Sequence, residues 1–261
     1  MSLRDKCALI TGSTGGLGRT VAEHFASEGC NVILNGVVPE SDMVAAVTAL
    51  EKMYGIKARY DRVDLRKPDE IAAMMQRAIE AFGAVDILVN NAVVRHFAPV
   101  EKFPVERWDE ALAVNISAVF HTIRLALPSM RQRGWGRIIN VASAYSFFAV
   151  ANRIDYVTTK TALLGLTRAV AVETAGEDIT CNSVAPATMP TPAIEGKIRG
   201  LAAEQGISVD TATRDYLAER QPGGRFVSMQ AVAALMGFLC GPNSRDISGA
   251  AIPLDCGWTA S

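Results

Sequence analysis

The stretch Cys7-Ala-Leu-Ile-Thr-Gly12-Ser-Thr-Gly-Gly-Leu-Gly18 decides the fold of this chain. Its opening, residues 7–11, is a short apolar run that predicts a buried strand, and a helical pattern follows the glycines at residues 17–27. Glycines in such a turn let the backbone come close to a phosphate, and the N-terminus of the following helix offers N–H groups and a partial positive charge. The stretch therefore predicts the first βα unit of a dinucleotide-binding fold.

The rest of the chain repeats this alternation of strand and helix. Further strands are predicted at residues 31–35, 57–61, 85–90, 137–141, 179–184 and 250–254, and further helices at 43–54, 68–82, 106–133, 156–175 and 228–240. Such alternation implies right-handed βαβ units and a parallel sheet covered on both faces. The predicted fold class is α/β, a Rossmann-type doubly wound parallel sheet with helices on both faces, in a single domain of residues 1–261.

One segment, at about residues 187–224, interrupts the alternation. It is rich in proline, glycine and charge, and it contains two short helical patterns at 193–205 and 209–220. Because this excursion follows the end of a predicted strand, it predicts a mobile lid over a binding site.

Composition narrows the classes of function. The 261 residues are 49% hydrophobic and 20% charged, and the formal net charge of -1 argues against nucleic acid or an anionic membrane as a partner. The five cysteines are scattered without metal-ligand spacing, which predicts buried thiols, no metal site and a reducing compartment. The chain has neither a signal-peptide pattern at its start nor an unbroken apolar run of about 18 residues, so a cytoplasmic location is expected.

Three residues are candidates for acid–base chemistry. Tyr156 and Lys160 are four apart in the predicted helix 156–175, so the phenol and the ammonium group share one face. A tyrosine has a reference pKa of about 10, and a nearby cation favours the phenolate, which makes a general acid or base. Ser143 follows the predicted strand 137–141, where its hydroxyl can hold a substrate oxygen. Taken alone, such a Tyr–Lys pair is more typical of a solvated helix face.

The second predicted strand bears on the choice of cofactor. It ends in Asn35-Gly36-Val37, with neither an acidic residue for a ribose 2′-hydroxyl nor an arginine for a 2′-phosphate. Asn35 can hydrogen-bond the ribose, and the lack of a basic cluster favours NAD over NADP. Asp64, after the third strand, either accepts a bond from the adenine amino group or serves as a turn carboxylate; both readings stand.

With these residues assembled, the chain resembles the short-chain dehydrogenases/reductases over essentially its whole length. The resemblance rests on the glycine motif Thr11 to Gly18, Asp64, Asn90-Asn91-Ala92, Val114-Asn115-Ile116-Ser117, Ser143, Tyr156-x-x-x-Lys160 and Pro186. It implies that Tyr156 transfers the proton, and that Ser143 positions the carbonyl or alcohol oxygen. It also implies that Lys160 lowers the tyrosine pKa and binds the nicotinamide ribose, and that Asn115 helps to hold a water in a proton relay. The cofactor contacts that it implies are Gly12, Thr14, Gly16, Leu17, Gly18, Asn35, Asp64, Asn91, Ala92, Tyr156, Lys160 and Pro186.

Several stretches are most similar to D-3-hydroxybutyrate dehydrogenases within that family. They are Val32-Ile-Leu-Asn-Gly36, Phe103-Pro with Trp108-Asp, Ser117-Ala-Val-Phe-His121, Glu173-Thr-Ala-Gly176 and Asp255-Cys-Gly-Trp-Thr-Ala260. This resemblance implies NAD as the cofactor and a homo-oligomer, commonly a tetramer.

Two departures from the family pattern lie on the cofactor side. Asn-Asn-Ala-Gly of the family reads Asn90-Asn91-Ala92-Val93 here, and Pro-Gly reads Pro186-Ala187. Because a β-branched valine fits poorly where the backbone needs a positive φ or approaches a ligand, these changes predict weakened or shifted cofactor binding.

The predicted substrate pocket departs further. Where the hydroxybutyrate enzymes generally hold a carboxylate with Gln, His, Lys and Gln, this chain aligns Arg95, Tyr145, Arg153 and Lys197. Arginine presents a planar fork that suits carboxylate, phosphonate or sulfonate oxygens. The predicted substrate-binding set is therefore Arg95, Ser143, Tyr145, Arg153, Tyr156 and Lys197, and the alternative is that the cations are solvated loop charges.

These observations predict an NAD-dependent oxidoreductase that interconverts a secondary alcohol and a ketone. The expected substrate is a small anion, either a hydroxy acid like 3-hydroxybutyrate or a sulfonate, phosphonate or larger carboxylate analogue. Two alternatives stay open: a dehydrogenase of an uncharged alcohol or sugar, and a catalytically idle, NAD-sensing regulatory protein.

Overall fold

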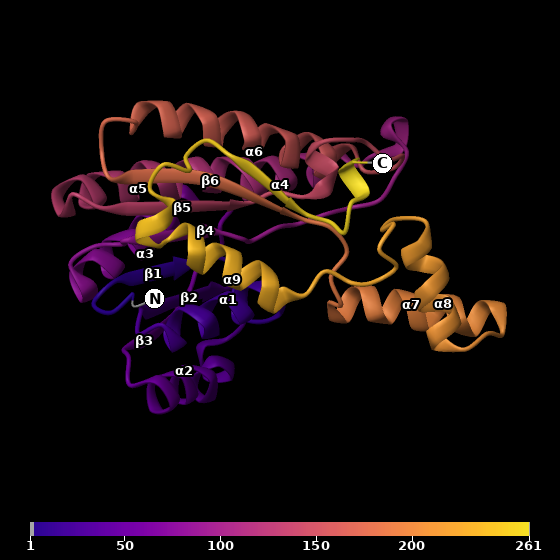
Figure 1. Ribbon diagram of the computed structural model, residues 1–261, viewed down its shortest axis with the longest axis horizontal. Coiled ribbons are helices and arrows are strands. Elements are labelled where there is room, and N and C mark those ends of the chain that lie inside the picture. The colour runs from indigo at the N-terminus through magenta and orange to yellow at the C-terminus, as the bar shows by residue number, and fades with distance from the viewer. Residues whose placement is uncertain (1–2, 261) are drawn as a thin grey trace.

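A single sheet of seven parallel strands forms the centre of the protein (Figure 1). The computed structural model describes residues 3–260. The spatial order of the strands is β3-β2-β1-β4-β5-β6-β7. Their bounds are β1 Cys7–Ile10, β2 Asn31–Gly36, β3 Ala58–Arg62, β4 Ile87–Asn90, β5 Gly136–Val141, β6 Ile179–Pro186 and β7 Ala251–Leu254. The order reverses between β1 and β4, and ligands of such sheets bind at this switch point. The predicted doubly wound fold is confirmed.

Helices cover both faces of the sheet (Figure 1). Their bounds are α1 Gly16–Ser27, α2 Glu40–Tyr54, α3 Pro68–Phe82, α4 Val105–Leu112, α5 Ala118–Arg133, α6 Ile154–Glu173, α7 Pro192–Gln205, α8 Val209–Ala218 and α9 Met229–Leu239. Successive strand residues point to opposite faces. Ile10 of β1 therefore packs in the core beneath α1 and α9, whereas Leu9 packs in the core beneath α3 and α5.

The predicted helix 106–133 has an internal irregularity. Between α4 and α5, residues Ala113–Ser117 form a π-helical turn. Asn115, at the centre of this turn, hydrogen-bonds Val94 and Thr159 outside the helix. Turns of this kind often mark functional sites. The whole run Val105–Arg133 is long and apolar enough to cross a membrane, a criterion that core helices also meet, and 44% of its most apolar window is buried here.

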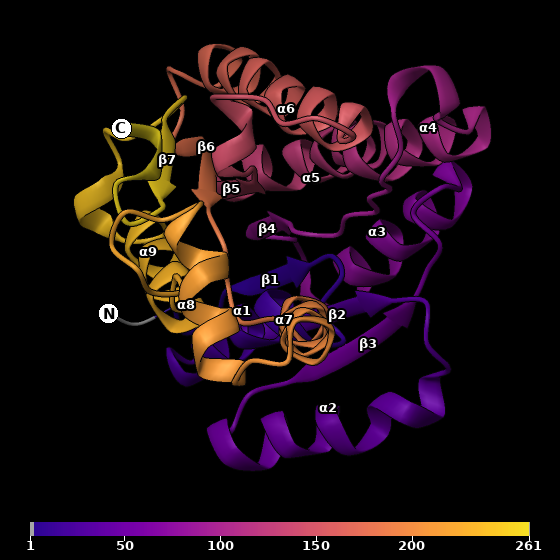
Figure 2. The same ribbon diagram turned by 90° about the vertical axis from the view of Figure 1, so that its right-hand side faces the viewer.

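The segment that interrupts the alternation forms a helical hairpin of α7 and α8. Thr191 caps α7 by accepting a bond from the Ile194 N–H, and Ser208 caps α8 in the same way. The hairpin has a small apolar core of its own, which includes Ile198, Ala202 and Ala212. It extends beyond the sheet at the right of Figure 1 and lies in front of the sheet in Figure 2.

The five cysteines form no disulfide. Cys7, Cys30, Cys181 and Cys240 are buried, as predicted, and Cys256 is half-buried. Within residues 3–260, no group of three or more His, Cys, Asp or Glu side chains is placed to hold a metal ion.

Candidate active site

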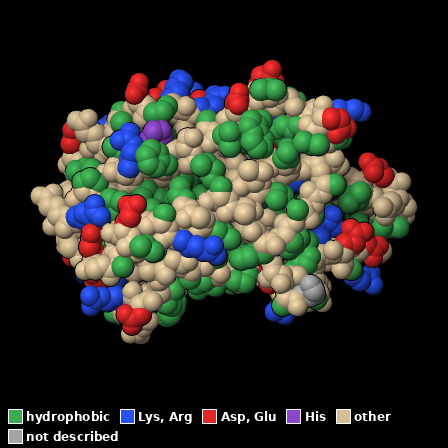
Figure 3. Space-filling model, turned by 90° about the horizontal axis from the view of Figure 1, so that it is seen from above, with side chains coloured by type: hydrophobic (Ala, Val, Ile, Leu, Met, Phe, Trp, Pro, Cys, Tyr) green, Lys and Arg blue, Asp and Glu red, His purple; other side chains and the backbone are tan. Residues whose placement is uncertain are grey.

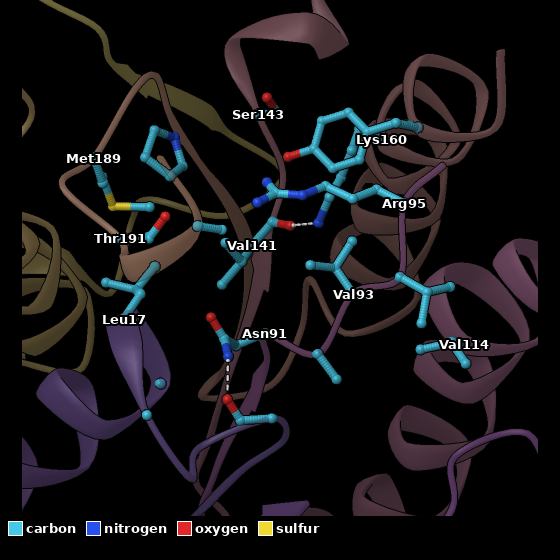
Figure 4. Close-up of a pocket in the computed structure, with 18 of the residues that line it drawn as sticks. Leu17, Asn91, Val93, Arg95, Val114, Val141, Ser143, Lys160, Met189 and Thr191 are labelled. Carbon is cyan, nitrogen blue, oxygen red and sulfur yellow. Dashed lines mark hydrogen bonds between the residues drawn. The ribbon is translucent and has the colours of Figure 1, made fainter. Parts of the chain in front are cut away.

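A cavity of about 760 Å³ lies where the carboxyl ends of the strands meet the α7–α8 hairpin. Figure 4 shows its centre, with Leu17 and Asn91 on one side and Ser143, Lys160 and Arg95 on the other. Most of the predicted site residues border it: Gly12, Thr14, Leu17, Gly18, Asn35, Asp64, Asn91, Ala92, Arg95, Ser143, Tyr145, Arg153, Tyr156, Lys160 and Pro186. Of the predicted residues, Gly16, Asn115 and Lys197 are not among those that line the cavity.

The glycine loop brings bare backbone to the cavity. Gly12 has a φ of 62°, and a Cβ there would lie 2.8 Å from the Cα of Ala92. A Cβ on Gly18 would lie 2.5 Å from the Gly12 carbonyl oxygen. Asn91 Nδ2 donates to the carbonyl oxygens of Thr11 and Gly12, at 2.9 Å each. No side chain caps α1 at Gly15, so the first N–H groups of the helix are available. This cradle fits the pyrophosphate of a dinucleotide.

Asn35 and Asp64 border the cavity but are already engaged. Asn35 is 1% exposed, and its Nδ2 donates to the carbonyl oxygens of Asp61 and Val63 at 3.2 and 3.3 Å. Arg66 donates from Nε and Nη2 to the Asp64 carboxylate, and these bonds hold the pKa of Asp64 below its ordinary value. Arg66 was not among the residues predicted from the sequence, because its pairing with Asp64 depends on the local turn.

Val93 and Ala187, which stand where the family pattern has glycines, are compatible with the backbone conformation at their positions. Val93 and Ala187 both border the cavity. The non-glycine residues with positive φ in the described chain are Asp5, Asn152 and Cys256. Val93 and Ala187 therefore have no positive φ, so neither residue strains the backbone in the way expected from the sequence.

Ser143 is fixed at the end of β5. It caps a short 3₁₀ helix, Ala144–Ser146, by accepting a bond from the Tyr145 N–H at 3.2 Å. Ser146 Oγ accepts from the Ser143 N–H and donates to the Lys160 carbonyl oxygen at 2.8 Å. This network ties Ser143 to α6, the helix that carries the other two candidates.

Tyr156 and Lys160 share one face of α6, at the cavity. The Lys160 Nζ lies 5.7 Å from the centre of the Tyr156 ring and donates to the Val141 carbonyl oxygen (Figure 4). Lys160 is 2% exposed. Burial, together with the nearby Arg95 guanidinium, lowers its pKa to about 7, so its positive charge is only partial at neutral pH.

Asn115 lies behind the cavity wall. It is 1% exposed, and its Oδ1 accepts from the Val94 N–H at 2.9 Å. Its Nδ2 donates to the Val94 carbonyl oxygen and to Thr159 Oγ1, at 3.0 and 3.1 Å. The side chain thereby fixes the backbone just before Arg95 against α6.

Arg153 is a buried cation in the wall of the cavity. Its guanidinium carbon lies 4.1 Å from the centre of the Phe97 ring and 4.5 Å from that of Tyr156. The residue is 9% exposed, and its Nε has no hydrogen-bond partner. Burial lowers its pKa from the ordinary arginine value. Within residues 3–260, no carboxylate lies at ion-pair distance from Arg153 or Arg95. Arg95 extends into the cavity towards Lys160 (Figure 4).

Lys197 does not line the cavity, whereas two residues outside the prediction, Trp258 and Arg220, do. Lys197 is exposed on α7, with its ammonium group 5.6 Å from the centre of the Tyr216 ring. Trp258 borders the cavity, with its ring 5.4 Å from that of Tyr145. Arg220, which follows α8, also borders it. The C-terminal stretch that contains Trp258 was a visible signal, whereas no sequence pattern pointed to Arg220.

Comparisons with known proteins agree with this geometry. Residues 6–200 match the family model for short chain dehydrogenases. The chain is 42% identical over 258 residues to D-beta-hydroxybutyrate dehydrogenase of Cupriavidus necator, covering 99% of each chain, and 39% identical to that of Rhizobium meliloti, covering 98% and 99%. Its structure superposes on L-sorbose reductase of Gluconobacter frateurii, solved with NADPH and L-sorbose, with a TM-score of 0.94, 28% identity and coverage of 100% and 98%. NAD⁺-bound xylitol dehydrogenase gives a TM-score of 0.88 at 25% identity, with coverage of 98% and 100%.

Proposed function

Since this chain belongs to the short-chain dehydrogenase family, we propose that it interconverts a secondary alcohol and a ketone on a small anionic substrate. The family assignment makes it an NAD(P)-dependent alcohol dehydrogenase or ketoreductase. The anionic substrate and the preference for NAD are the parts of the proposal that need support from this chain's own residues.

The proposal of an anionic substrate rests on Arg153. A buried guanidinium group without a carboxylate partner is costly unless a ligand supplies the charge. Two aromatic rings pack against it at 4.1 and 4.5 Å, and its N–H donors lie along the edge of the guanidinium group, where an anion can bind. One of those rings belongs to Tyr156, which places the anion beside the proposed proton acceptor. A hydroxy acid satisfies both groups at once.

The proposed reaction divides the work among three residues. Ser143 holds the substrate oxygen, and Tyr156 takes the proton of the hydroxyl group. Lys160, whose Nζ lies 5.7 Å from the centre of the Tyr156 ring, stabilises the phenolate form that accepts this proton. A bound nicotinamide dinucleotide would supply the hydride acceptor. Backbone strain does not support the idle, sensing alternative, since neither Val93 nor Ala187 has a positive φ.

We propose NAD as the cofactor, because Asn35-Gly36-Val37 brings no arginine to the end of β2. One observation favours NADP instead. Arg62 of β3 donates from Nε to the Val37 carbonyl oxygen at 3.1 Å and so places a cation beside that end. Rates with both cofactors on one substrate decide between them.

We also propose that the protein forms a homo-oligomer through α5 and α6. Phe120 of α5 is 54% exposed and Val172 of α6 is 77% exposed. Exposed Ala162, Gly165 and Ala169 make the intervening surface of α6 small and apolar. Figure 3 shows hydrophobic side chains across this side of the molecule. Such a face is typical of a buried interface. A solution mass of one 27.9 kDa chain by light scattering contradicts this proposal.

Arg153→Met tests the anionic substrate directly. We expect the KM of a hydroxy acid to rise by about 10- to 100-fold, because a charge-assisted bond is lost, while a neutral secondary alcohol changes by less than about threefold. Absorbance of the reduced cofactor measures both rates. Arg245→Met, an arginine with a 67% exposed side chain that does not line the cavity, is the matched control and should change neither. An equal rise in KM for the hydroxy acid and the neutral alcohol would refute the proposal that the substrate is an anion.

A further inference from the structure

The end of the cavity near Tyr145 holds more positive charge than one carboxylate balances. Lining the cavity are five cationic residues and two acids: Arg66, Arg95, Arg153, Lys160 and Arg220, with Asp64 and Glu110. Both acids pair with Arg66, at 2.6 Å for Asp64 and 3.5 Å for Glu110. Arg95, Arg153 and Arg220 are therefore left without an acid from the cavity wall.

Arg220 is held in place by the helical hairpin rather than by the sheet. Its guanidinium carbon lies 4.1 Å from the centre of the Tyr216 ring, and its Nη1 donates to the Tyr216 carbonyl oxygen at 2.9 Å. The same Nη1 donates to Glu219, whose side chain is 74% exposed, whereas that of Arg220 is 23% exposed. Because a solvated carboxylate neutralises little, Arg220 keeps most of its charge for the cavity.

Tyr145 lines the same cavity as Arg220 and Arg153. Its ring centre is 6.0 Å from the Arg153 guanidinium carbon, and its ring packs edge-on against those of Tyr156 and Trp258 at 6.2 and 5.4 Å. Burial raises the pKa of Tyr145, and the charges of Arg220 and Arg153, the next largest influences, lower it. The charges of both arginines therefore reach this one ring, at one end of the cavity.

We propose that the substrate is a hydroxy dicarboxylate, with one carboxylate on Arg153 beside Tyr156 and the other on Arg220, which lines the same cavity. This inference rests on the proposed function and adds a second charge to its substrate. Arg220 comes from the α7–α8 hairpin, so the second carboxylate also joins the hairpin to the rest of the site.

The test compares substrates that differ at one group. 3-Hydroxyglutarate carries a carboxylate where 3-hydroxybutyrate carries a hydrogen, and the monoamide of 3-hydroxyglutarate keeps the size while removing the second charge. We expect kcat/KM for the dicarboxylate to exceed that for the monoamide by about 10- to 100-fold, the loss expected for one charge-assisted hydrogen bond. This comparison uses the unaltered protein, so it needs no variant to fold.

Arg220→Met then assigns the effect to this residue. It should abolish the preference for the dicarboxylate through KM and leave the monoamide within about threefold. Arg214→Met, an exposed arginine of α8, is the matched control and should keep the preference.

The possible outcomes distinguish a failure of this inference from a failure of the proposed function. If 3-hydroxybutyrate or the monoamide is turned over as well as the dicarboxylate or better, the proposed second carboxylate of the substrate is wrong. The proposed function is then unaffected. A preference that survives Arg220→Met overturns the assignment to Arg220. Absence of cofactor reduction with every hydroxy acid overturns both.

Discussion

The two ends of the cavity differ in how their polar groups are satisfied. At the dinucleotide end, Asp64 is paired with Arg66, and Asn91 bonds the glycine loop at 2.9 Å. At the other end, Arg153 is 9% exposed with an unpartnered Nε, and no acid of the described chain pairs with it or with Arg95.

The difference follows from how each end meets its ligand. A pyrophosphate is bound by backbone N–H groups, which the fold itself arranges, so side chains there are free to pair with one another. An anionic substrate is bound by side-chain charge, which must stay unpaired until the substrate arrives. Under the proposed function, this unbalanced charge is the part of the cavity that selects the substrate.

The largest expected effect separates chemistry from binding. Tyr156→Phe removes the proposed proton acceptor and should lower turnover by about 100- to 10,000-fold. Dinucleotide affinity, measured by fluorescence titration, should change little, since the glycine loop is untouched. Tyr54→Phe, at the end of α2, is the matched control. Turnover retained in Tyr156→Phe would remove the tyrosine from the mechanism.

A smaller effect tests the preformed end. In Gly18→Ala the new Cβ would lie 2.5 Å from the Gly12 carbonyl oxygen, and backbone cannot yield as a flexible side chain can. Overpacking of this kind costs about 1–3 kcal/mol, so dinucleotide affinity should fall by about 10- to 100-fold. Gly176→Ala, where a Cβ meets nothing within 4 Å, should leave affinity unchanged. Unaltered affinity in Gly18→Ala would contradict the close approach of the loop.

The smallest expected effect, counted over one pH unit, concerns Lys160. Its pKa falls from 10.5 to about 7 on folding, so below pH 7 both states are protonated and the cost of burying the charge is constant. From there to pH 10.5 the folded state has lost the proton and the unfolded state has not, so stability rises with pH. The gain is at most about 1.4 kcal/mol per pH unit.

Urea unfolding of the protein and of Lys160→Met at several pH values measures this contribution. The difference between their free energies of unfolding should shift in favour of the unaltered protein as the pH rises above 7. A difference that does not vary with pH would show that Lys160 is not desolvated in the folded state.

Local sequence patterns predicted one part of the site well. The spacing of Tyr156 and Lys160 places both on one face of α6 wherever the helix lies, because side chains four apart in a helix are neighbours. The glycine loop was equally readable, since its glycines meet a steric demand within the first βα unit. Other residues could not be assigned from local patterns. Asn35 was expected to hydrogen-bond the ribose; it borders the cavity, and its Nδ2 donates to the carbonyl oxygens of Asp61 in β3 and of Val63 just after that strand.

The sequence by itself determined the alternation of strands and helices, the dinucleotide loop and the Tyr–Lys pair, because each depends on neighbours within about one turn or one βα unit. Only the tertiary structure decided which cations line the cavity. Lys197 and Arg220 both belong to the hairpin region, yet the first is exposed and the second borders the cavity. The placement of Arg153 likewise required Phe97 from a distant loop. Such placements follow from how helices pack, and the energy of packing is shared among segments far apart in the chain.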